Sequence, residues 1–133
     1  CLGELGEVFF HGLAVKPGKP TLAGSIGETL VVGLPGHPAA AYLVFYELVR
    51  PLLAALQGET LVERTIPTAL ASAIPSNHGR EELVPVLLHE GIATHIPSKS
   101  GVITTLARAD GYFRIPRDAE GLPQGARVDV ILF

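Results

Sequence analysis

The sequence predicts an α/β unit in its first half, followed by a small all-β unit that is barrel-like or a sandwich. Two observations support this fold class. Residues 39–56 are strongly apolar and long enough for a helix, and short β-rich runs precede them. After Gly58 the helical pattern is absent, and β-branched runs alternate with Gly, Pro, Asp and Asn, which is typical of strands joined by tight turns. We therefore assign residues 1–58 to the α/β unit and residues 59–133 to the β unit.

Composition limits the classes of function. The chain has 133 residues, 47% hydrophobic and 17% charged, which suffices for the core of one domain or two small ones. A formal net charge of −3 argues against nucleic acid as a partner, because the phosphate backbone requires a basic surface. The single cysteine, Cys1, excludes an internal disulfide framework and fits a reducing compartment.

Neither a leader nor a membrane span is expected. The longest apolar run, Pro38–Tyr46, is shorter than the ~20 residues of a membrane span, and the first residues form no secretory leader. We therefore expect a cytoplasmic protein. The sequence contains no methionine, and Cys1–Glu7 has the composition of a helix tail that stops at Gly3 or Gly6. We therefore expect the chain to be the C-terminal part of a longer polypeptide.

Three strands are predicted before the helix. They are Val8–Val15, Thr21–Ile26 and Thr29–Leu34, with a turn at Gly27–Glu28 between the last two. The KPGKP segment at 16–20 excludes regular structure, because each proline removes a donor and restricts the residue before it. Three strands and one helix are few for an α/β unit, so we expect a sheet with an open edge.

The helix is predicted to follow GLPGHP at residues 33–38 and to end near Gly58. Pro38 suits the first helical position, where its missing N–H costs nothing, and His37 is the expected N-cap. Pro51 lies inside the apolar run, so we expect a kink or a break there, with Pro51 opening a second helix.

The start of this helix is a candidate anion site. The N–H groups of Ala39, Ala40 and Ala41 are expected to point out from its positive end, and Gly36 would let a ligand approach the backbone. The alternative is that Pro and Gly merely begin the helix.

Lys16 and Lys19 flank a stiff Pro-Gly turn. Strand ends and helix starts gather at one edge of an open α/β sheet, so two ammonium groups in such a loop suit a phosphate or another oxyanion. The alternative is a solvated turn.

The second half is predicted to be a β module with two polar turns. The turns are NHGRE (77–81) and SKSG (98–101), with Arg80, Lys99 and Ser100 suited to oxyanions or to ordinary connections. Asp110–Gly111 is predicted to be a hairpin turn. The five histidines have no metal-ligand spacing. The predicted strands are Leu61–Ala71, Leu83–Leu88, Gly91–Ile96, Val102–Leu106, Tyr112–Ile115 and Arg127–Leu132.

Several motifs follow one another along the chain: KPGKP, GLPGHP, a helix ending VRPLLAALQG, and a β unit with GRE, KSG and ADGYFRIP…EGLPQGARVDVILF. In this order they resemble the C-terminal part of the molybdopterin molybdotransferase family (the MoeA/gephyrin type). The resemblance covers nearly the entire chain. It implies that residues 1–58 are the second half of a three-layer α/β molybdopterin-binding domain similar to the small molybdopterin-adenylating proteins (MoaB/MogA-like). Residues 59–133 would be the C-terminal β-barrel-like domain.

The resemblance also implies a function. Members of the family insert molybdate into adenylylated molybdopterin and release AMP, assisted by Mg²⁺, and they work as dimers. Because the Mg²⁺ ligands and the phosphate loop of the family lie upstream of the matching region, this chain alone is expected to be inactive.

The family's site residues map onto three segments. Two positions depart from the family pattern, which usually has Asn where this chain has His37 and often Ser where it has Ala40. A non-catalytic anion-binding or scaffolding module therefore remains an alternative, and so does a stand-alone anion-binding domain. The implied positions are Lys16, Pro17, Lys19 and Pro20 near the molybdate and phosphate, Pro35, Gly36 and Pro38 near the pterin phosphate, and Arg80 and Ser100 at oxyanion positions of the second domain.

Overall fold

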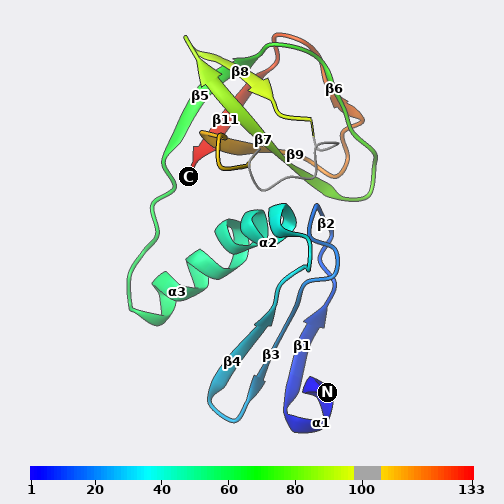
Figure 1. The fold of residues 1–133 in the computed structure, drawn as a ribbon, viewed down its shortest axis with the longest axis vertical. Helices are drawn as coiled ribbons and strands as arrows, with labels where there is room; N and C mark the ends of the chain where they lie inside the picture. The colour runs from blue at the N-terminus through cyan, green and yellow to red at the C-terminus, as the bar shows by residue number, and fades with distance from the viewer. Residues whose placement is uncertain (98–105) are drawn as a thin grey trace. The chain divides into compact units, whose positions relative to one another are not determined.

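The structure, a computed structural model, describes residues 1–97 and 106–133. The chain divides into two units, Cys1–Thr60 and Leu61–Phe133, and each is considered by itself (Figure 1). The first unit has an antiparallel three-stranded sheet and one long interrupted helix. Its elements are α1 (Leu2–Leu5), β1 (Glu7–His11), β2 (Val15–Lys16), β3 (Leu22–Ile26), β4 (Thr29–Gly33), α2 (Pro38–Val44), a π-helical turn η1 (Phe45–Val49) and α3 (Arg50–Leu56).

The sheet of the first unit has the strand order β1-β3-β4. The predicted strands at 21–26 and 29–34 are confirmed to within one residue, and the turn between them lies at Gly27, whose φ is +58°. The prediction that one strand spans Val8–Val15 is wrong. The strand ends at His11, because Gly12 takes a φ of +107° and turns the chain out of the sheet.

The long helix is interrupted just before Pro51, as the sequence predicts. Pro51 has no N–H to donate to the carbonyl of Glu47, four residues earlier. The turn before it is widened, and the N–H of Arg50 donates to the carbonyl of Phe45, five residues earlier. Pro51 lies in the first turn of α3, where proline is tolerated.

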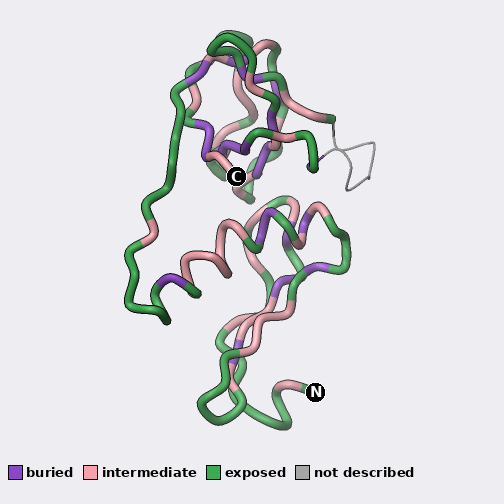
Figure 2. The backbone as a smooth tube through the Cα atoms, turned by 60° about the vertical axis from the view of Figure 1, so that its left-hand side comes forward, coloured by how far each residue is buried: buried purple, intermediate pink, exposed green. Residues whose placement is uncertain are grey.

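This helix is apolar on more than one face. Over Pro38–Leu56 it has 19 residues with a mean hydropathy of 1.5, which is long and apolar enough to cross a membrane by length and composition alone. The core helix of a soluble protein passes the same test. The apolar length therefore exceeds the run estimated from the sequence. Buried stretches alternate with exposed ones along it (Figure 2), and Tyr42, Phe45, Leu53 and Leu56 are exposed.

The second unit is a closed five-stranded barrel, so the predicted barrel-like β module is confirmed. Around the barrel the order is β7-β8-β5-β11-β9, and β9 pairs back to β7. All pairs are antiparallel except β5 with β8. The two remaining strands of this unit, β6 and β10, pair with each other as an antiparallel two-stranded ribbon. The strands are β5 (Thr65–Leu70), β6 (Ile74–Pro75), β7 (Glu81–His89), β8 (Ile92–His95), β9 (Gly111–Ile115), β10 (Gly121–Leu122) and β11 (Arg127–Leu132).

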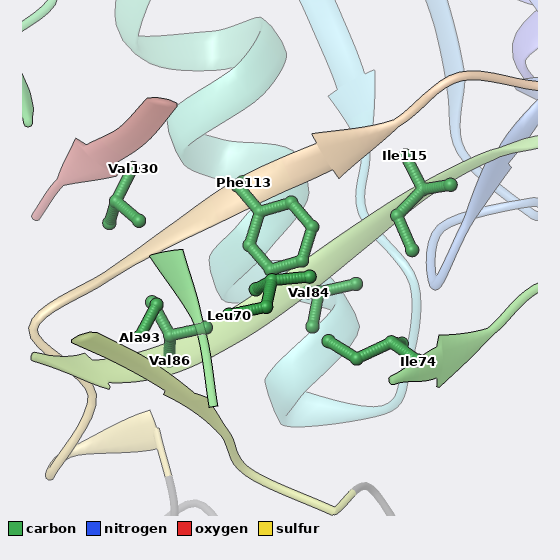
Figure 3. Close-up of a cluster of buried hydrophobic side chains, with 8 residues drawn as sticks. All are labelled: Leu70, Ile74, Val84, Val86, Ala93, Phe113, Ile115 and Val130. Atoms are coloured by element: carbon green, nitrogen blue, oxygen red, sulfur yellow. The ribbon is translucent and has the colours of Figure 1, made fainter. Parts of the chain in front are cut away.

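The barrel encloses one cluster of buried apolar side chains (Figure 3). Side chains from every barrel strand meet there, so the strands are held by burial from all sides of the ring. The cluster consists of Leu70, Ile74, Val84, Val86, Ala93, Phe113, Ile115 and Val130.

One turn assignment differs from the sequence prediction. The Asp110–Gly111 hairpin is wrong, because Gly111 is the first residue of β9, and a Cβ there would lie 2.2 Å from the carbonyl oxygen of Ile131. The glycine permits close strand approach rather than a turn. A separate tight turn joins β7 to β8 at Glu90 and Gly91, with φ values of 48° and 78°. Residues 102–105 of a predicted strand lie outside the described residues.

Candidate functional site

The KPGKP and GLPGHP segments leave the sheet of the first unit at the same end. His11 is paired with Leu22, and Leu22 is paired with Gly33, so the end of β1, the start of β3 and the end of β4 are neighbours. The loop 12–21 joins β1 to β3, and residues 34–37 join β4 to α2 (Figure 1). The sheet register therefore brings both sequence motifs to one edge of the unit, as the sequence predicts.

The lysine-proline loop is held by backbone and hydroxyl hydrogen bonds. The N–H of Leu13 donates to the carbonyl of Lys19 at 3.0 Å. Thr21, which is fully buried, donates from its N–H at 3.1 Å and from its Oγ1 at 2.7 Å to the carbonyl of Gly18. Two donors on one acceptor fix the turn, so the backbone that carries Lys16 and Lys19 is ordered.

Gly18 anchors this loop against the helix. Its φ is +134°, and a Cβ there would lie 2.6 Å from Cγ2 of Val44 in α2 and 2.9 Å from Cγ2 of Val15. Only glycine fits such a contact and such a backbone conformation. Around this buried anchor, Pro17 is half-buried while Lys16 and Lys19 are exposed. The loop is therefore fixed at its centre, and both of its lysines are exposed.

The helix start has the geometry expected from the sequence, with one correction. His37 is the N-cap and Pro38 the first helical residue, and the imidazole makes no capping hydrogen bond. The N–H of Ala41 is not available to a ligand, because it donates to the carbonyl of His37 at 3.0 Å. Among the described residues no acceptor contacts the N–H groups of Ala39 or Ala40, so two amides, not three, face outward at this position.

The turn before the helix is open at Gly36. Pro35 is buried and anchors the turn, whereas Gly36 is exposed and a Cβ there would meet nothing within 4 Å. The backbone of this turn can thus be approached by a ligand. Ala40 is only 4% exposed. A serine hydroxyl at that position would face the interior, so the absence of serine removes no outward donor.

The charge at this edge is positive. Residues 11–21 and 33–41 contain two lysines and no carboxylate. The exposed ammonium groups and the two amides are the donors that a doubly charged oxyanion requires.

Arg80 belongs to the second unit. It ends the exposed turn 77–80, directly before β7. The N–H of Gly79 donates to the carbonyl of Arg117 at 2.8 Å, and Nε2 of His78 lies 3.1 Å from Oε1 of Glu120. The turn is therefore held in place next to an exposed guanidinium. Ser100, the other oxyanion residue expected in this unit, lies outside the described residues.

The described residues do not form a site for the Mg²⁺ that the resemblance implies. Mg²⁺ binds to oxygen ligands, mostly carboxylates and waters. No group of three or more His, Cys, Asp or Glu side chains within residues 1–97 and 106–133 is placed to hold a metal ion.

One residue of this edge is not identified by the sequence motifs. Thr21 fixes the lysine-proline loop through its two hydrogen bonds to the carbonyl of Gly18. Its position three residues after Gly18 is the only signal in the sequence for a hydroxyl bond to a turn carbonyl.

Comparison with known proteins follows the same division of the chain. Residues 2–55 match the family described as a probable molybdopterin binding domain, and residues 68–133 match the MoeA C-terminal region (domain IV). A Methanocaldococcus jannaschii protein named for molybdopterin biosynthesis is 34% identical over 97% of the chain. The molybdopterin molybdenumtransferase of Bacillus subtilis is 30% identical over 95% of it.

A solved structure shares the fold. The crystal structure of a molybdopterin biosynthesis MoeA protein from Pyrococcus horikoshii matches with a TM-score of 0.89 and 38% identity, covering 98% of this chain and 33% of that one. The chain covers 31% of each of the two curated relatives named above. It therefore spans about a third of their length.

Proposed function

The chain belongs to the MoeA family, and we propose that it forms part of a molybdopterin molybdotransferase that inserts molybdate into adenylylated molybdopterin during molybdenum cofactor biosynthesis. The names of the curated relatives support this proposal. So does the matching of both halves of the chain to successive regions of such proteins. Because the chain spans about a third of its relatives, the complete reaction is proposed for the polypeptide that contains it, and the chain alone is expected to be inactive.

The observation that best supports this function is that two loops leave the β1-β3-β4 sheet at the same end. Molybdate and phosphate are both oxyanions, and each is bound best by cations and N–H donors held in a fixed arrangement. The KPGKP loop offers two ammonium groups from a backbone fixed by Gly18 and Thr21. The GLPGHP turn offers an open backbone and two amides.

Each predicted site residue has a proposed role. Lys16 and Lys19 attract the molybdate and the phosphate, and Pro17 stiffens the loop that carries them. Pro35 anchors the second turn, while Gly36 lets the pterin phosphate approach the backbone. The remaining proposed oxyanion contacts are His37, Arg80 and Ser100.

The division of the chain has a matching proposal. Residues 1–58 would be the second half of the α/β molybdopterin-binding domain, and residues 59–133 the C-terminal β-barrel-like domain. The active protein would be a cytoplasmic homodimer that uses Mg²⁺. The exposed apolar side chains on the helix of the first unit, such as Leu53 and Leu56, agree with a surface that other protein segments cover.

The alternative is a module that binds the anion without catalysing the transfer. His37 favours it, because an imidazole replaces the amide side chain that the family usually has there. Changing His37→Asn distinguishes the two: a gain in molybdenum insertion shows that this position limits activity, whereas no change removes the reason for the alternative.

The test of the proposed function is molybdenum insertion by the polypeptide that contains this chain. We expect Lys16→Ala and Lys19→Ala each to lower the rate by about tenfold or more, because each removes a charge-assisted hydrogen bond to the substrate oxyanion. Arg127→Ala, which removes an exposed cation from β11, is the matched control and should retain the rate. Equal rates in all three variants would contradict the site assignment.

A further inference from the structure

We propose that the segment joining the two units bends at a short hinge, residues 60–62, because the two residues that follow are strapped to the barrel. The strap consists of Glu63 and Arg64, which are held by Arg114 and Leu132 of the second unit. The inference concerns how the chain passes from one unit to the next, and it does not depend on the proposed function.

The helix of the first unit is closed firmly before the hinge. Gly58 has a φ of +74°, a conformation that glycine adopts without strain. Its N–H donates to the carbonyl of Ala55 at 3.1 Å, and the N–H of Glu59 donates to the carbonyl of Ala54 at 2.8 Å. These two bonds form a Schellman motif at the end of α3. The backbone is therefore fixed as far as Glu59.

The strap binds the chain to the barrel directly after the hinge. Nη2 of Arg114 donates to Oε1 of Glu63 at 2.8 Å, and the N–H of Leu132 donates to the carbonyl of Arg64 at 2.9 Å. Arg114 lies within β9, where it is paired with Leu83 of β7, and Leu132 is the last residue of β11. Both partners stand on barrel strands, so the chain is fixed again from Glu63 onward.

Only residues 60–62 remain between these two fixed points, in the segment between α3 and β5 (Figure 1). In the part of the chain that the structure describes, Thr60, Leu61 and Val62 make no hydrogen bond. Val62 is 75% exposed, and the boundary between the units falls between Thr60 and Leu61. Segments with few contacts and exposed backbone open most readily. We therefore expect a change in the angle between the units to use the dihedral angles of these residues.

The ion pair of the strap is partly exposed, which sets the size of its effect. The side chain of Arg114 is 35% exposed and that of Glu63 is 41% exposed, so water and salt screen their attraction. Pairs of this kind contribute little to stability. Removing one partner is expected to raise the population of the detached strap about two- to fivefold.

Thermolysin digestion of the native protein tests the hinge. This protease cleaves before large apolar residues, and the segment offers such bonds inside and outside the hinge. We expect cleavage before Leu61 or Val62 to be much faster than cleavage before Leu56, at the end of α3, or Ile66, in β5. Equal rates at the four bonds, measured from the new amino termini by mass spectrometry, would contradict the hinge.

Trypsin digestion tests the strap. Trypsin does not cleave before proline, so within residues 1–64 it can cut only after Arg64, because a proline follows Lys16, Lys19 and Arg50. The new amino terminus at Thr65 therefore reports on the strap alone. We expect it to form about two- to fivefold faster in Arg114→Gln. Arg127→Gln, which removes an exposed cation from β11, is the matched control and should leave the rate unchanged.

Hydrogen exchange in Glu63→Gln gives a second readout that leaves every barrel strand intact. The N–H of Leu132 loses its acceptor when the strap detaches, so its exchange should become about two- to fivefold faster. The N–H of Leu88, which is bonded to the Asp110 carboxylate, should exchange at an unchanged rate. Unchanged exchange at Leu132, or cleavage after Arg64 that is as slow in Arg114→Gln as in Arg127→Gln, would overturn the strap.

Discussion

Replacing Gly18 with alanine tests how the lysine-proline loop is fixed to the helix. The φ of +134° is a conformation that side chains rarely adopt, and such strain costs about 1–3 kcal/mol. The new Cβ would also lie 2.6 Å from Val44 and 2.9 Å from Val15, and overpacking of this kind costs about 1–3 kcal/mol. The reduced freedom of the unfolded chain returns roughly 0.4–1 kcal/mol. We therefore expect a net loss of about 2–4 kcal/mol of unfolding free energy.

Urea unfolding provides the assay, and Gly36→Ala is the matched control on the other loop. Gly36 has no positive φ, and a Cβ there meets nothing within 4 Å, so its substitution should change the unfolding free energy by less than about 0.5 kcal/mol. Val44→Ala combined with Gly18→Ala should destabilise by less than the sum of the single changes, because the smaller side chain relieves the clash. Equal stability of the two glycine variants would refute the reasoning.

Three further predictions concern single residues. Glu90→Asn should stabilise the protein by roughly 0.5 kcal/mol, because Glu90 has a φ of 48° in the β7–β8 turn and asparagine tolerates that conformation better; an equal or lower urea midpoint would contradict this. Asp110→Ala should cost about 1 kcal/mol and speed hydrogen exchange at Leu88, whose N–H donates to the Asp110 carboxylate at 2.7 Å; unchanged exchange would argue against it. Partial burial of the phenol group and a hydrogen bond with Tyr46 raise the pKa of Tyr42 to about 12, so its stabilising contribution should be complete below pH 10 and lost as the pH rises toward 12; phenolate absorbance in which Tyr42 titrates at its ordinary pKa would be inconsistent with this.

The sequence predicted those elements whose local signals agree with their surroundings. The Thr29–Leu34 strand, the helix that begins at Pro38 and the break at Pro51 depend on proline, glycine and β-branched residues acting over a few positions. The barrel followed from regularly spaced short strands. Each of these features is determined locally, so a single sequence contains enough information to place it.

The errors arose where distant residues decide the outcome. Gly111 was assigned to a turn because it follows an aspartate, yet it is needed for close approach to Ile131, a contact that only the folded barrel creates. The strand ending at His11 was predicted too long, because the apolar residues after it continue the β pattern while Gly12 turns away to bond with Thr21. Propensity gives no information on either contact.

In the candidate site, too, the residues marked by local motifs were predicted and those that depend on distant contacts were not. The motifs indicated Lys16, Lys19 and Gly36 because lysine, proline and glycine carry their chemistry in their residue type. Thr21 could not be assigned to the site, since its hydrogen bonds to the carbonyl of Gly18 form only when the loop closes. The predicted outward amide of Ala41 was wrong because the carbonyl of His37 accepts its hydrogen bond once the helix forms.

The most direct test of the central claim, that the two loops of the first unit form one oxyanion site, is a crystal structure of the protein with bound tungstate located by its anomalous scattering. The account predicts a tungstate at the end of the β1-β3-β4 sheet, within hydrogen-bond distance of Lys16 or Lys19 and of the backbone between Gly36 and Ala40. A fully occupied tungstate elsewhere on the first unit, with none between these loops, would contradict it.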